Sequence, residues 1–318
     1  MKILSIGEIL WDVIQGAEYV GGAPFNFAAH ARRLGHDVRF ISAVGADARG
    51  RLALARAGEL GLSTRFVRVA PDRPTGIVTV ALDAGGQPRF TIHRPAAYDF
   101  PHIREEDLRD LLDPEPDWIY FGTLQQTSAE ARALTARLTE AAPAAKRFYD
   151  VNLRAGCYTA SLVGELIRRA AVVKLNEEEV CGVEQMMGME QDRHAVRDER
   201  AAAGYGDRAL IPHGGTALMR FCEGGAARFG WEAACVTRAA AGCVAWVAGQ
   251  SIEAPGYRVE VADAVGAGDA FAAAFLHGLG AGWPPRRIAD FANRVGALVA
   301  SRAGAIPEWT LEEAEALA

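Results

Sequence analysis

The chain has 318 residues, enough for one large α/β domain or two smaller ones, and its 34 Lys and Arg against 40 Asp and Glu give a net charge of -6. This mild acidity comes without a basic run or stripe, which argues against a nucleic-acid partner. The 5 cysteines stand singly, without a Cys-x-x-Cys pair, and are typical of buried thiols in a reducing compartment.

The first residues, MKILSIGEIL, have an apolar run that is too short for a membrane span and lacks a signal-peptide cleavage site. We therefore expect a cytoplasmic protein without membrane contact. Residues 2–7 are apolar and β-branched and end in glycine, which predicts a buried strand. Residues 27–35 have the spacing of a helix that stops at a glycine, and residues 37–45 predict the next strand. This order predicts a parallel crossover unit.

The same alternation continues along the chain. Further helices are predicted at residues 53–61, 128–142 and 161–170, and further strands at residues 117–124, 146–154 and 171–179, the last running into a helix. We therefore predict an α/β fold with a doubly wound, mostly parallel sheet flanked by helices, in a single domain over residues 1–318. Residues 184–230 give no clear elements, because glycine-rich turns interrupt weak helical signals.

Residues 64–94 do not follow this alternation of strands and helices. Their strand-like runs are separated by the turns PDRP and DAGGQP with no helix between them, which predicts an antiparallel meander. Such an insertion either packs over the carboxyl ends of the parallel strands, where ligands bind, or remains a decorative edge ribbon. We expect the former, a small β-sheet lid built from segments at about residues 10–20 and 64–98.

The run DAVGAGDAFAAAF, residues 263–275, joins a glycine-rich turn to an apolar helical pattern. Glycines let the backbone turn tightly with its N–H groups outward, and a helix start adds a positive dipole end, so this loop is suited to bind an anion. Asp269 falls in the first helical turn, where a carboxylate is also a common capping group. The stretch alone leaves both roles open.

Four motifs in the chain resemble those of the ribokinase-like (PfkB-type) carbohydrate kinases. In chain order they are GGAPFN at residues 21–26, DVNLR at 150–154, NEEE at 176–179 and DAVGAGD at 263–269. The resemblance extends from Gly7 to about Pro307, and the first two motifs are most similar to those of fructokinases. It implies a ribokinase-like sheet with a β lid and the ATP-dependent phosphorylation of a small sugar. It also implies Mg²⁺, a monovalent cation such as K⁺ in several relatives, and a homodimer paired through the lid.

The resemblance further implies a reaction centre. Asp269 matches the family's general base, which takes the proton from the sugar hydroxyl, and Gly266, Ala267 and Gly268 match its anion hole. Phosphoryl transfer requires such a positioned base and donors aimed at negative charge. Arg154 would neutralise charge on the moving phosphoryl group, with a surface salt bridge as the alternative.

By the same resemblance, one group of residues contacts the sugar: Asp12, Gly21, Gly22, Asn26, Arg94, Asp150 and Asn152. Glycines permit a close approach of the backbone, and Asp or Asn side chains pair with two hydroxyls at once. The residues alone leave other readings open, namely an ordinary turn at the two glycines, a helix-start role for Asn26 and a solvated edge-strand position for Arg94.

A second group belongs to the nucleotide side: Asn176, Thr237, Arg238, Gly242, Asp263 and Asn293, with Glu179 as the residue that organises Mg²⁺. Magnesium keeps most of its waters, so few protein ligands are expected. The alternative for Asn176 and Glu179 is the capped, acidic start of a helix. For Asn293 it is a polar position within a buried helix.

Two positions depart from the family pattern. Ala264 stands where the family has Thr, and Ala239 stands where it has Gly. If Ala239 requires a positive φ or crowds the phosphates, ATP affinity suffers. The alternatives to a fructokinase are therefore a kinase of another small sugar or keto-deoxy sugar acid, and a sugar or nucleotide sensor with weakened catalysis. A Rossmann oxidoreductase is disfavoured, because only Gly7 follows the first strand, without Gly-x-Gly-x-x-Gly.

Overall fold

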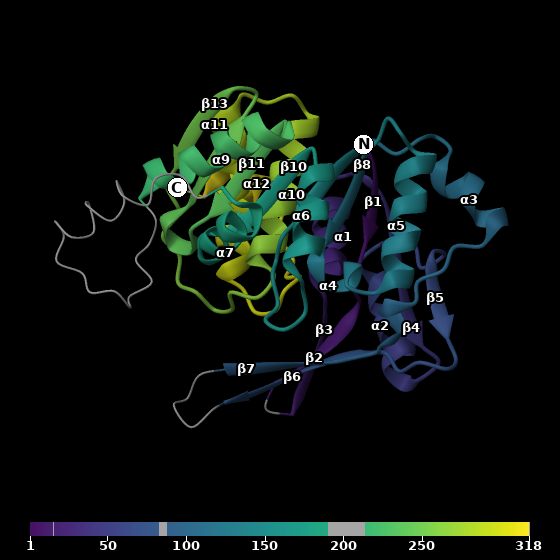
Figure 1. Cartoon of the computed structure of the whole chain (residues 1–318). Helices are drawn as coiled ribbons and strands as arrows, with labels where there is room; N and C mark the ends of the chain where they lie inside the picture. The colour runs from purple at the N-terminus through teal and green to yellow at the C-terminus, as the bar shows by residue number, and fades with distance from the viewer. Residues whose placement is uncertain (15, 83–87, 190–213, 318) are drawn as a thin grey trace.

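The computed structural model describes residues 1–14, 16–82, 88–189 and 214–317. Within these residues, nine strands form a large sheet with helices on both faces, and four more strands form a smaller sheet that projects beside it (Figure 1). The large sheet has the order β13-β12-β11-β10-β9-β8-β1-β4-β5. Its strands run parallel from β5 to β11, and β12 and β13 add an antiparallel edge. The predicted doubly wound, mostly parallel α/β fold is thus confirmed.

The central strands of the large sheet are buried on both faces. All five residues of β1 and of β8 are buried, as expected of strands that helices cover on each side. The nine strands are β1 (Lys2–Ile6), β4 (Asp37–Gly45), β5 (Val67–Ala70), β8 (Trp118–Gly122), β9 (Lys146–Asp150), β10 (Val172–Asn176), β11 (Ala233–Thr237), β12 (Cys243–Val247) and β13 (Gln250–Ala254).

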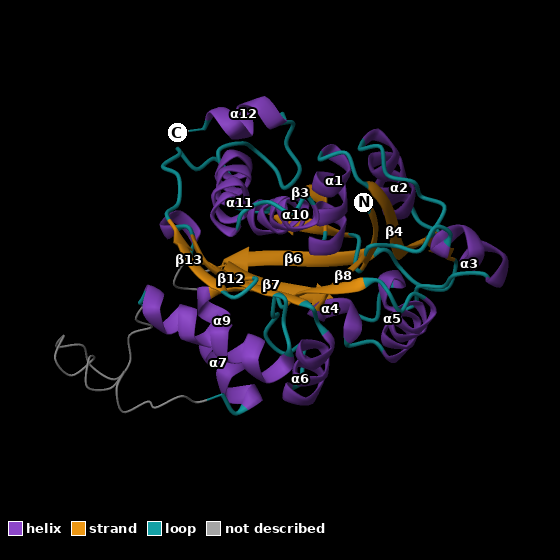
Figure 2. Ribbon diagram, turned by 90° about the horizontal axis from the view of Figure 1, so that it is seen from above, coloured by secondary structure: helices purple, strands orange, loops and turns teal. Residues whose placement is uncertain are grey.

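The helices lie in two layers, one on each face of the sheet (Figure 2). One layer contains α1 (Ala23–Arg33), α2 (Ala48–Glu59), α10 (Ala267–Gly280), α11 (Pro285–Ala300) and α12 (Leu311–Ala316). The other contains α5 (Ala129–Ala141), α6 (Ala160–Arg169), α7 (Glu177–Met187) and α9 (Gly215–Phe229). Two shorter helices, α3 (Glu105–Leu112) and α4 (Thr123–Gln126), complete the set. None of the described helices is long and apolar enough to cross a membrane.

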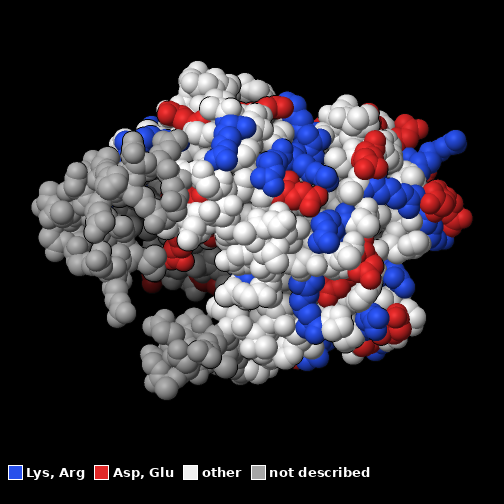
Figure 3. Space-filling model, viewed as in Figure 1, with Lys and Arg blue, Asp and Glu red and all other residues white. Residues whose placement is uncertain are grey.

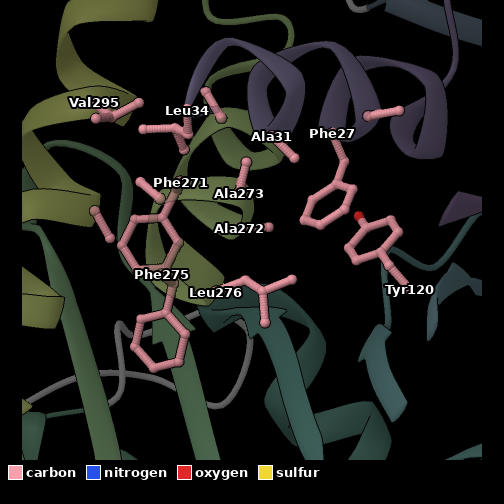
Figure 4. Packing of buried hydrophobic residues seen from close by; sticks show 14 of the residues in the cluster. Phe27, Ala31, Leu34, Tyr120, Phe271, Ala272, Ala273, Phe275, Leu276 and Val295 are labelled. Carbon is pink, nitrogen blue, oxygen red and sulfur yellow. The ribbon is translucent and has the colours of Figure 1, made fainter. Parts of the chain in front are cut away.

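Helix α10 is the buried centre of its layer. Figure 4 shows Ala273 of α10 next to Ala31 of α1, and both belong to one hydrophobic cluster with Phe271 and Phe275 of α10. Alanines on α10 have no long side chains to separate it from its neighbours, which lets the helix backbones approach closely. The glycine-rich turn that precedes α10 is therefore fixed by the core.

The smaller sheet, which we call the lid, has the order β3-β2-β6-β7. Its strands are β2 (Leu10–Ile14), β3 (Ala17–Gly21), β6 (Gly76–Leu82) and β7 (Pro88–His93). Strand β2 pairs antiparallel with β3 and parallel with β6, and β6 pairs antiparallel with β7. The two lid segments come from distant parts of the chain and meet in this sheet.

The prediction of a meander over residues 64–94 is wrong at its first strand. Strand β5 pairs parallel with β4 in the large sheet, with Val67 opposite Ser42. It buries Val67 and Ala70 there, so its apolar residues extend the large sheet and not the lid. Only β6 and β7 form the predicted antiparallel pair.

Two helices begin earlier than predicted. Helix α1 starts at Ala23 because Pro24 is favourable in a first helical turn, and α2 starts at Ala48 because the Asp47 side chain accepts a hydrogen bond from the Gly50 N–H. In the stretch 184–230, where no clear elements were predicted, α7 ends at Met187 and α9 begins at Gly215. Residues 190–213 of that stretch lie outside the described residues.

Candidate active site

A cleft of about 1710 Å³ lies between the lid and the carboxyl ends of the parallel strands. Lid residues such as Asp12, Tyr19 and Phe90 line one side, and the loops that follow β1, β9 and β10 and the turn before α10 line the other. Parallel strands end at one edge of the sheet, which is why these loops meet although they are far apart in sequence.

The turn before α10 has the geometry of an anion-binding helix start. Gly266 adopts the left-handed conformation, with φ 80°, and a Cβ there would lie 2.3 Å from the carbonyl oxygen of Ala305. Only glycine fits this position. Gly266 and Gly268 line the cleft, whereas Ala267 does not. The N–H groups of Ala267 and Asp269 donate to the carbonyls of Ala264 and Gly266 at 3.4 and 3.1 Å. The N–H groups of Gly266 and Gly268 are therefore the ones left for an anion at the cleft wall, next to the positive dipole end of α10.

Asp263 fixes the shape of this turn. Its Oδ1 accepts a hydrogen bond from the Val265 N–H at 2.9 Å, and its Oδ2 accepts one from the Gly304 N–H at 3.1 Å. The residue also lines the cleft. The position of Asp263 is compatible with the predicted place near the nucleotide, but both oxygens of its carboxylate are used to hold the loop.

Asp269 faces the cleft from the first turn of α10 and is 8% exposed. Asn26 of α1 donates a hydrogen bond from Nδ2 to Asp269 Oδ2 at 2.8 Å. No side chain caps α10, so the capping role that the sequence left open for Asp269 is not used. Burial raises the pKa of Asp269 to about 7, against the opposing effect of the Lys174 charge. A carboxylate with such a pKa is suited to accept a proton near neutral pH.

Lys174 on β10 is a cleft residue that the motif analysis missed. Its Nζ lies 3.0 Å from each oxygen of Asp150, and Tyr120 Oη donates to Asp150 Oδ2 at 2.9 Å. A Cβ at Gly268 would lie 3.4 Å from Lys174 Nζ, so the ammonium sits directly behind the glycine turn. The sequence did contain a signal for Lys174, which is a lysine in the middle of the apolar strand VVKLN. Because a buried lysine needs a charged partner, such a position indicates a nearby carboxylate.

Asp150 is not where the sequence analysis placed it. It was predicted to lie between sugar and phosphate, but it is 1% exposed, does not line the cleft, and instead holds Lys174. The later residues of DVNLR do reach the cleft. Asn152, with φ 36°, and Arg154 line it. The Arg154 charge lowers the pKa of Glu8, Asp12 and Asp269, so this cation acts electrostatically on all three carboxyls.

Asn176 and Glu179 form a capping box at the start of α7. Asn176 Oδ1 accepts from the Glu179 N–H at 3.0 Å, and Glu179 Oε2 accepts from the Asn176 N–H at 2.9 Å. The other Glu179 oxygen accepts from the Leu153 N–H. Asn176 lines the cleft but Glu179 does not, so this carboxylate serves the helix start and the DVNLR loop.

The described residues hold no group of three or more His, Cys, Asp or Glu side chains that could bind a metal. A metal ion in this cleft would depend on phosphate and water for most of its ligands. Such a donor set fits magnesium, which usually retains several waters and is shared with substrate phosphates.

Only part of the predicted nucleotide side lines the cleft. Thr237 does, and its Oγ1 donates to the Leu175 carbonyl at 3.5 Å. Arg238 and Gly242 do not: Arg238 forms an ion pair with Glu253, and Gly242, with φ 90°, makes a turn in which a Cβ would lie 2.2 Å from the Ala254 carbonyl oxygen.

Asn293 is also outside the cleft lining. It is buried in α11, and its Nδ2 donates to the carbonyls of Ala254 at 3.2 Å and Pro255 at 3.1 Å. It therefore fixes the segment after β13 to α11, as the alternative reading of a polar position in a buried helix anticipated. Of the two departures from the family pattern, Ala264 lines the cleft, and Ala239 has a φ of 47°. Ala239 therefore has a positive φ, which is the conformation that the sequence analysis linked to a lower affinity for ATP.

Apart from Asp150, the predicted sugar residues come together at the cleft, with one further exception. Asp12, Gly22 and Asn26 line the cleft, and Gly21 packs beside Asp12, since a Cβ at Gly21 would lie 2.8 Å from Asp12 Oδ2. Burial raises the pKa of Asp12 to about 6.

Arg94 is the exception. It forms a two-pronged ion pair with Asp99, also donates to the Leu124 carbonyl at 3.3 Å, and does not line the cleft. In this structure a nearby buried carboxylate, Asp99, takes up the Arg94 guanidinium, so the predicted contact of Arg94 with the sugar stays a prediction. The residue is also not the solvated arginine of the alternative.

Glu8 is a second cleft residue that the motif analysis missed. It follows β1 directly, is 5% exposed, and its Oε2 has no hydrogen-bond partner among the described residues. The signal in the sequence was a carboxylate immediately after a buried strand, at the edge where ligands bind.

Three comparisons agree with this geometry. A family model described as pfkB family carbohydrate kinase matches residues 5–218 and 223–311. The chain is 27% identical over 324 residues to a fructokinase of Klebsiella pneumoniae, covering 96% of this chain and 95% of that protein. It is 26% identical over 325 residues to an aminoimidazole riboside kinase of Salmonella typhimurium, covering 96% and 91%. The crystal structure of a fructokinase with bound ATP from Xylella fastidiosa superposes with a TM-score of 0.79 at 25% identity, covering 99% of this chain and 97% of that one.

Proposed function

This chain belongs to the pfkB family of carbohydrate kinases, and we propose that within this family it phosphorylates fructose. Its membership and its kinase relatives make it an ATP-dependent sugar kinase. The choice of fructose is supported by the similarity to a fructokinase over nearly the whole chain and by the GGAPFN and DVNLR motifs. Another small sugar, a riboside or a keto-deoxy sugar acid is the competing acceptor, since a riboside kinase matches almost as well.

One arrangement carries the proposed mechanism: the cleft-facing carboxylate of Asp269, held by Asn26, at the head of a helix whose glycine turn lines the same cleft. Asp269 accepts the proton of the sugar hydroxyl. The hydroxyl oxygen then forms a bond to the γ-phosphorus of ATP while the bond to the β,γ-bridging oxygen breaks and ADP leaves. The N–H groups of Gly266 and Gly268 hold the negative charge of the transferring group, and Arg154 neutralises it from the opposite loop.

Magnesium bound to the phosphates would supply charge neutralisation and orientation, with Asn176 at the cleft wall and Glu179 behind it as the residues we expect to order its waters. A requirement for K⁺ remains a prediction from the family resemblance. The nucleotide would approach along Thr237 and Asp263.

The assay that tests this proposal measures ADP release by the purified chain with ATP, Mg²⁺ and fructose. Fructose-dependent release of ADP supports it. If calorimetry detects fructose binding but no ADP is released, the chain is a sensor with decayed catalysis. If a panel of ribosides or sugar acids is phosphorylated and fructose is not, the kinase assignment holds and the substrate assignment fails.

We also propose that two copies pair through their lids in the cytoplasm. Tyr19 on β3 and Phe90 on β7, which also line the cleft, are 54% and 63% exposed, an unusual exposure for two aromatic side chains on one small sheet. All five cysteines are free, which fits a reducing compartment. Light scattering at micromolar concentration tests the dimer, and Tyr19→Ser with Phe90→Ser should shift the mass to that of a monomer. A monomeric wild type contradicts it.

The surface charge is consistent with a small-molecule substrate and no nucleic-acid partner. On the face shown in Figure 3, Lys and Arg side chains alternate with Asp and Glu side chains, without a continuous basic band. Binding of nucleic acid usually depends on such a band.

A further inference from the structure

Glu8 is a cleft residue with a carboxylate oxygen that no described residue uses. The residue is buried, lines the cleft, and its Oε2 has no hydrogen-bond partner among the described residues. A buried polar atom without a partner is costly unless something else satisfies it, and such atoms are rare in folded proteins. Because the residue lines the cleft, we expect the group that satisfies Oε2 to come from a ligand that enters the cleft.

The position of Glu8 is fixed by its neighbours. Gly22, with φ 115°, lets the start of α1 pass so closely that a Cβ there would lie 2.4 Å from the Glu8 carbonyl oxygen and 3.3 Å from Glu8 Cγ. Burial raises the pKa of the Glu8 carboxyl to about 7, and the backbone amides of Glu8 and Ala23 oppose this shift by favouring the charged form. One end of the side chain is therefore held at the helix start while the other oxygen remains available.

Asn26 adds a second unpartnered acceptor at the same end of the cleft. Its Nδ2 is used by Asp269, and its Oδ1 is buried without a partner. Together with the carboxyls of Glu8, Asp12 and Asp269, this wall consists mainly of hydrogen-bond acceptors. It is complementary to a ligand with several hydroxyl donors.

The charges around Glu8 point to an uncharged ligand. The charged or titratable side chains that interact with it are Arg154, Arg94, Tyr98 and Tyr120. Of the two arginines, Arg94 is already paired with Asp99. The remaining arginine, Arg154, acts on the carboxyls of Glu8, Asp12 and Asp269, and the other nearby cation of the cleft wall, Lys174, is paired with Asp150. A sugar acid placed here would therefore meet more negative than positive charge.

We propose that Glu8 is a specificity-determining residue, which accepts a hydrogen bond from a hydroxyl of the acceptor and, together with Asp12, selects an uncharged sugar against a sugar acid. This inference rests on the proposed function in that it takes the lid side of the cleft as the acceptor site. It goes further, because it assigns a role to a residue outside the four motifs and excludes one class of acceptor.

The test is Glu8→Gln, which keeps the shape of the side chain and removes its charge. We expect KM for fructose to rise about ten- to hundredfold, the usual effect of losing a hydrogen bond to a charged group, while KM for ATP is unchanged. We also expect the preference for fructose over 2-dehydro-3-deoxygluconate to fall, because one repulsive charge has been removed.

The matched control is Asp107→Asn. Asp107 is likewise a buried carboxylate, 4% exposed, but it lies on α3, pairs with Arg65 and Arg104, and does not line the cleft. Its substitution should lower thermal stability and leave both KM values unchanged. If Glu8→Gln does not fold, as judged by circular dichroism, Glu8→Asp replaces it, since withdrawing the carboxylate should raise KM for fructose in the same direction.

Three results would overturn the role of Glu8. The first is an unchanged KM for fructose in the variant. The second is an equal loss in both KM values and kcat, which indicates a structural role. The third is a wild type that prefers the sugar acid. If the wild type releases no ADP with any acceptor, the proposed function fails, and the role of Glu8 is then tested separately. For this test, calorimetry measures fructose binding to the wild type and to Glu8→Gln without ATP. Equal binding by the two proteins, or no binding by either, contradicts the role of Glu8.

Discussion

Asn26 and Asp269 are 243 positions apart in the sequence, yet the Asn26 amide donates a 2.8 Å hydrogen bond to the Asp269 carboxylate. The bond joins the first turn of α1 to the first turn of α10, so the two signature motifs of the chain meet at one carboxyl group. It occupies one oxygen of the proposed base and fixes its direction.

Replacing Asp269 by Asn should remove the base and keep the shape of the cleft. We expect kcat to fall by about a hundredfold or more, since a positioned base contributes roughly a hundredfold to ten-thousandfold, and the affinity for fructose to change little. Steady-state kinetics and calorimetry measure the two quantities. If fructose binding is lost in parallel with kcat, Asp269 is structural.

The pH dependence of turnover should report Asp269. Its pKa is raised to about 7, and a base acts only when deprotonated, so kcat/KM should fall as the pH drops below about 7. The hydrogen bond from Asn26 lowers this pKa, and Asn26→Ala removes that contribution. The acidic limb of the variant's pH profile should therefore move to higher pH. A limb that stays in place, or moves to lower pH, contradicts the assignment.

The buried pair of Lys174 and Asp150 should be important for stability as a pair. Lys174→Met leaves the Asp150 carboxylate buried without its cation, which should lower the free energy of unfolding by about 3–5 kcal/mol. The double variant Lys174→Met, Asp150→Leu removes both charges and should recover much of that loss. Urea unfolding of the three proteins measures it. Equal stability of the single and double variants would show that the charges are not coupled.

His30 should make the fold sensitive to acid. Burial lowers its pKa from 6.5 to about 4, and Trp309 Nε1 donates to its Nδ1 at 3.1 Å, which fixes the neutral ring. His30 binds a proton below about pH 6.5 in the unfolded chain but only near pH 4 in the folded chain. The contribution of the neutral ring to the free energy of unfolding is therefore complete at neutral pH. It is lost as the pH falls from about 6.5 to about 4, by about 3 kcal/mol in total.

The comparison of wild type with His30→Asn isolates this contribution. Asp269 and Glu8 have raised pKa values, so they increase the free energy of unfolding as the pH falls, but they do so equally in the wild type and the variant. Urea unfolding at pH 7 and pH 5 should show a steeper loss of unfolding free energy for the wild type. Identical pH slopes for the two proteins would exclude His30 as the cause.

Ala239→Gly tests the altered nucleotide loop. Ala239 has a φ of 47°, a conformation that costs an alanine about 1 kcal/mol and a glycine almost nothing. We expect the variant to have a lower KM for ATP and an unchanged KM for fructose. If KM for ATP does not change, the departure from the family pattern at this position has no consequence for nucleotide binding.

The sequence allowed the sheet, the lid and most of the cleft to be predicted, because apolar strands followed by polar loops identify the edge where ligands bind. Asn152, Arg154, Asn176 and Asp269 each follow such a strand or a glycine turn, and all line the cleft. The same reasoning extends to Glu8, which stands with Asp12 in the stretch GEILWD after the first strand but was assigned no role.

The sequence interpretation and the structure differ where a side chain had two possible partners. Arg94 was expected to face a ligand but pairs with Asp99, five residues away, and Asp150 was expected to face the sugar but pairs with Lys174 on the neighbouring strand. Such choices depend on the register of strands and the depth of burial, which the pattern of residue types does not encode. The same holds for β5, whose alternating residues fit either sheet.

The glycine turn rests on residues that are synthesised after it. Gly266 packs against Ala305, Gly304 donates to Asp263, and Trp309 reaches back to His30 on α1. While the ribosome is still translating the segment from residue 300 to residue 309, the emerging polypeptide can form the sheet but not complete the phosphate cradle. Protein shortened by a premature stop or by proteolysis in that segment should therefore lack activity even where its sheet has formed.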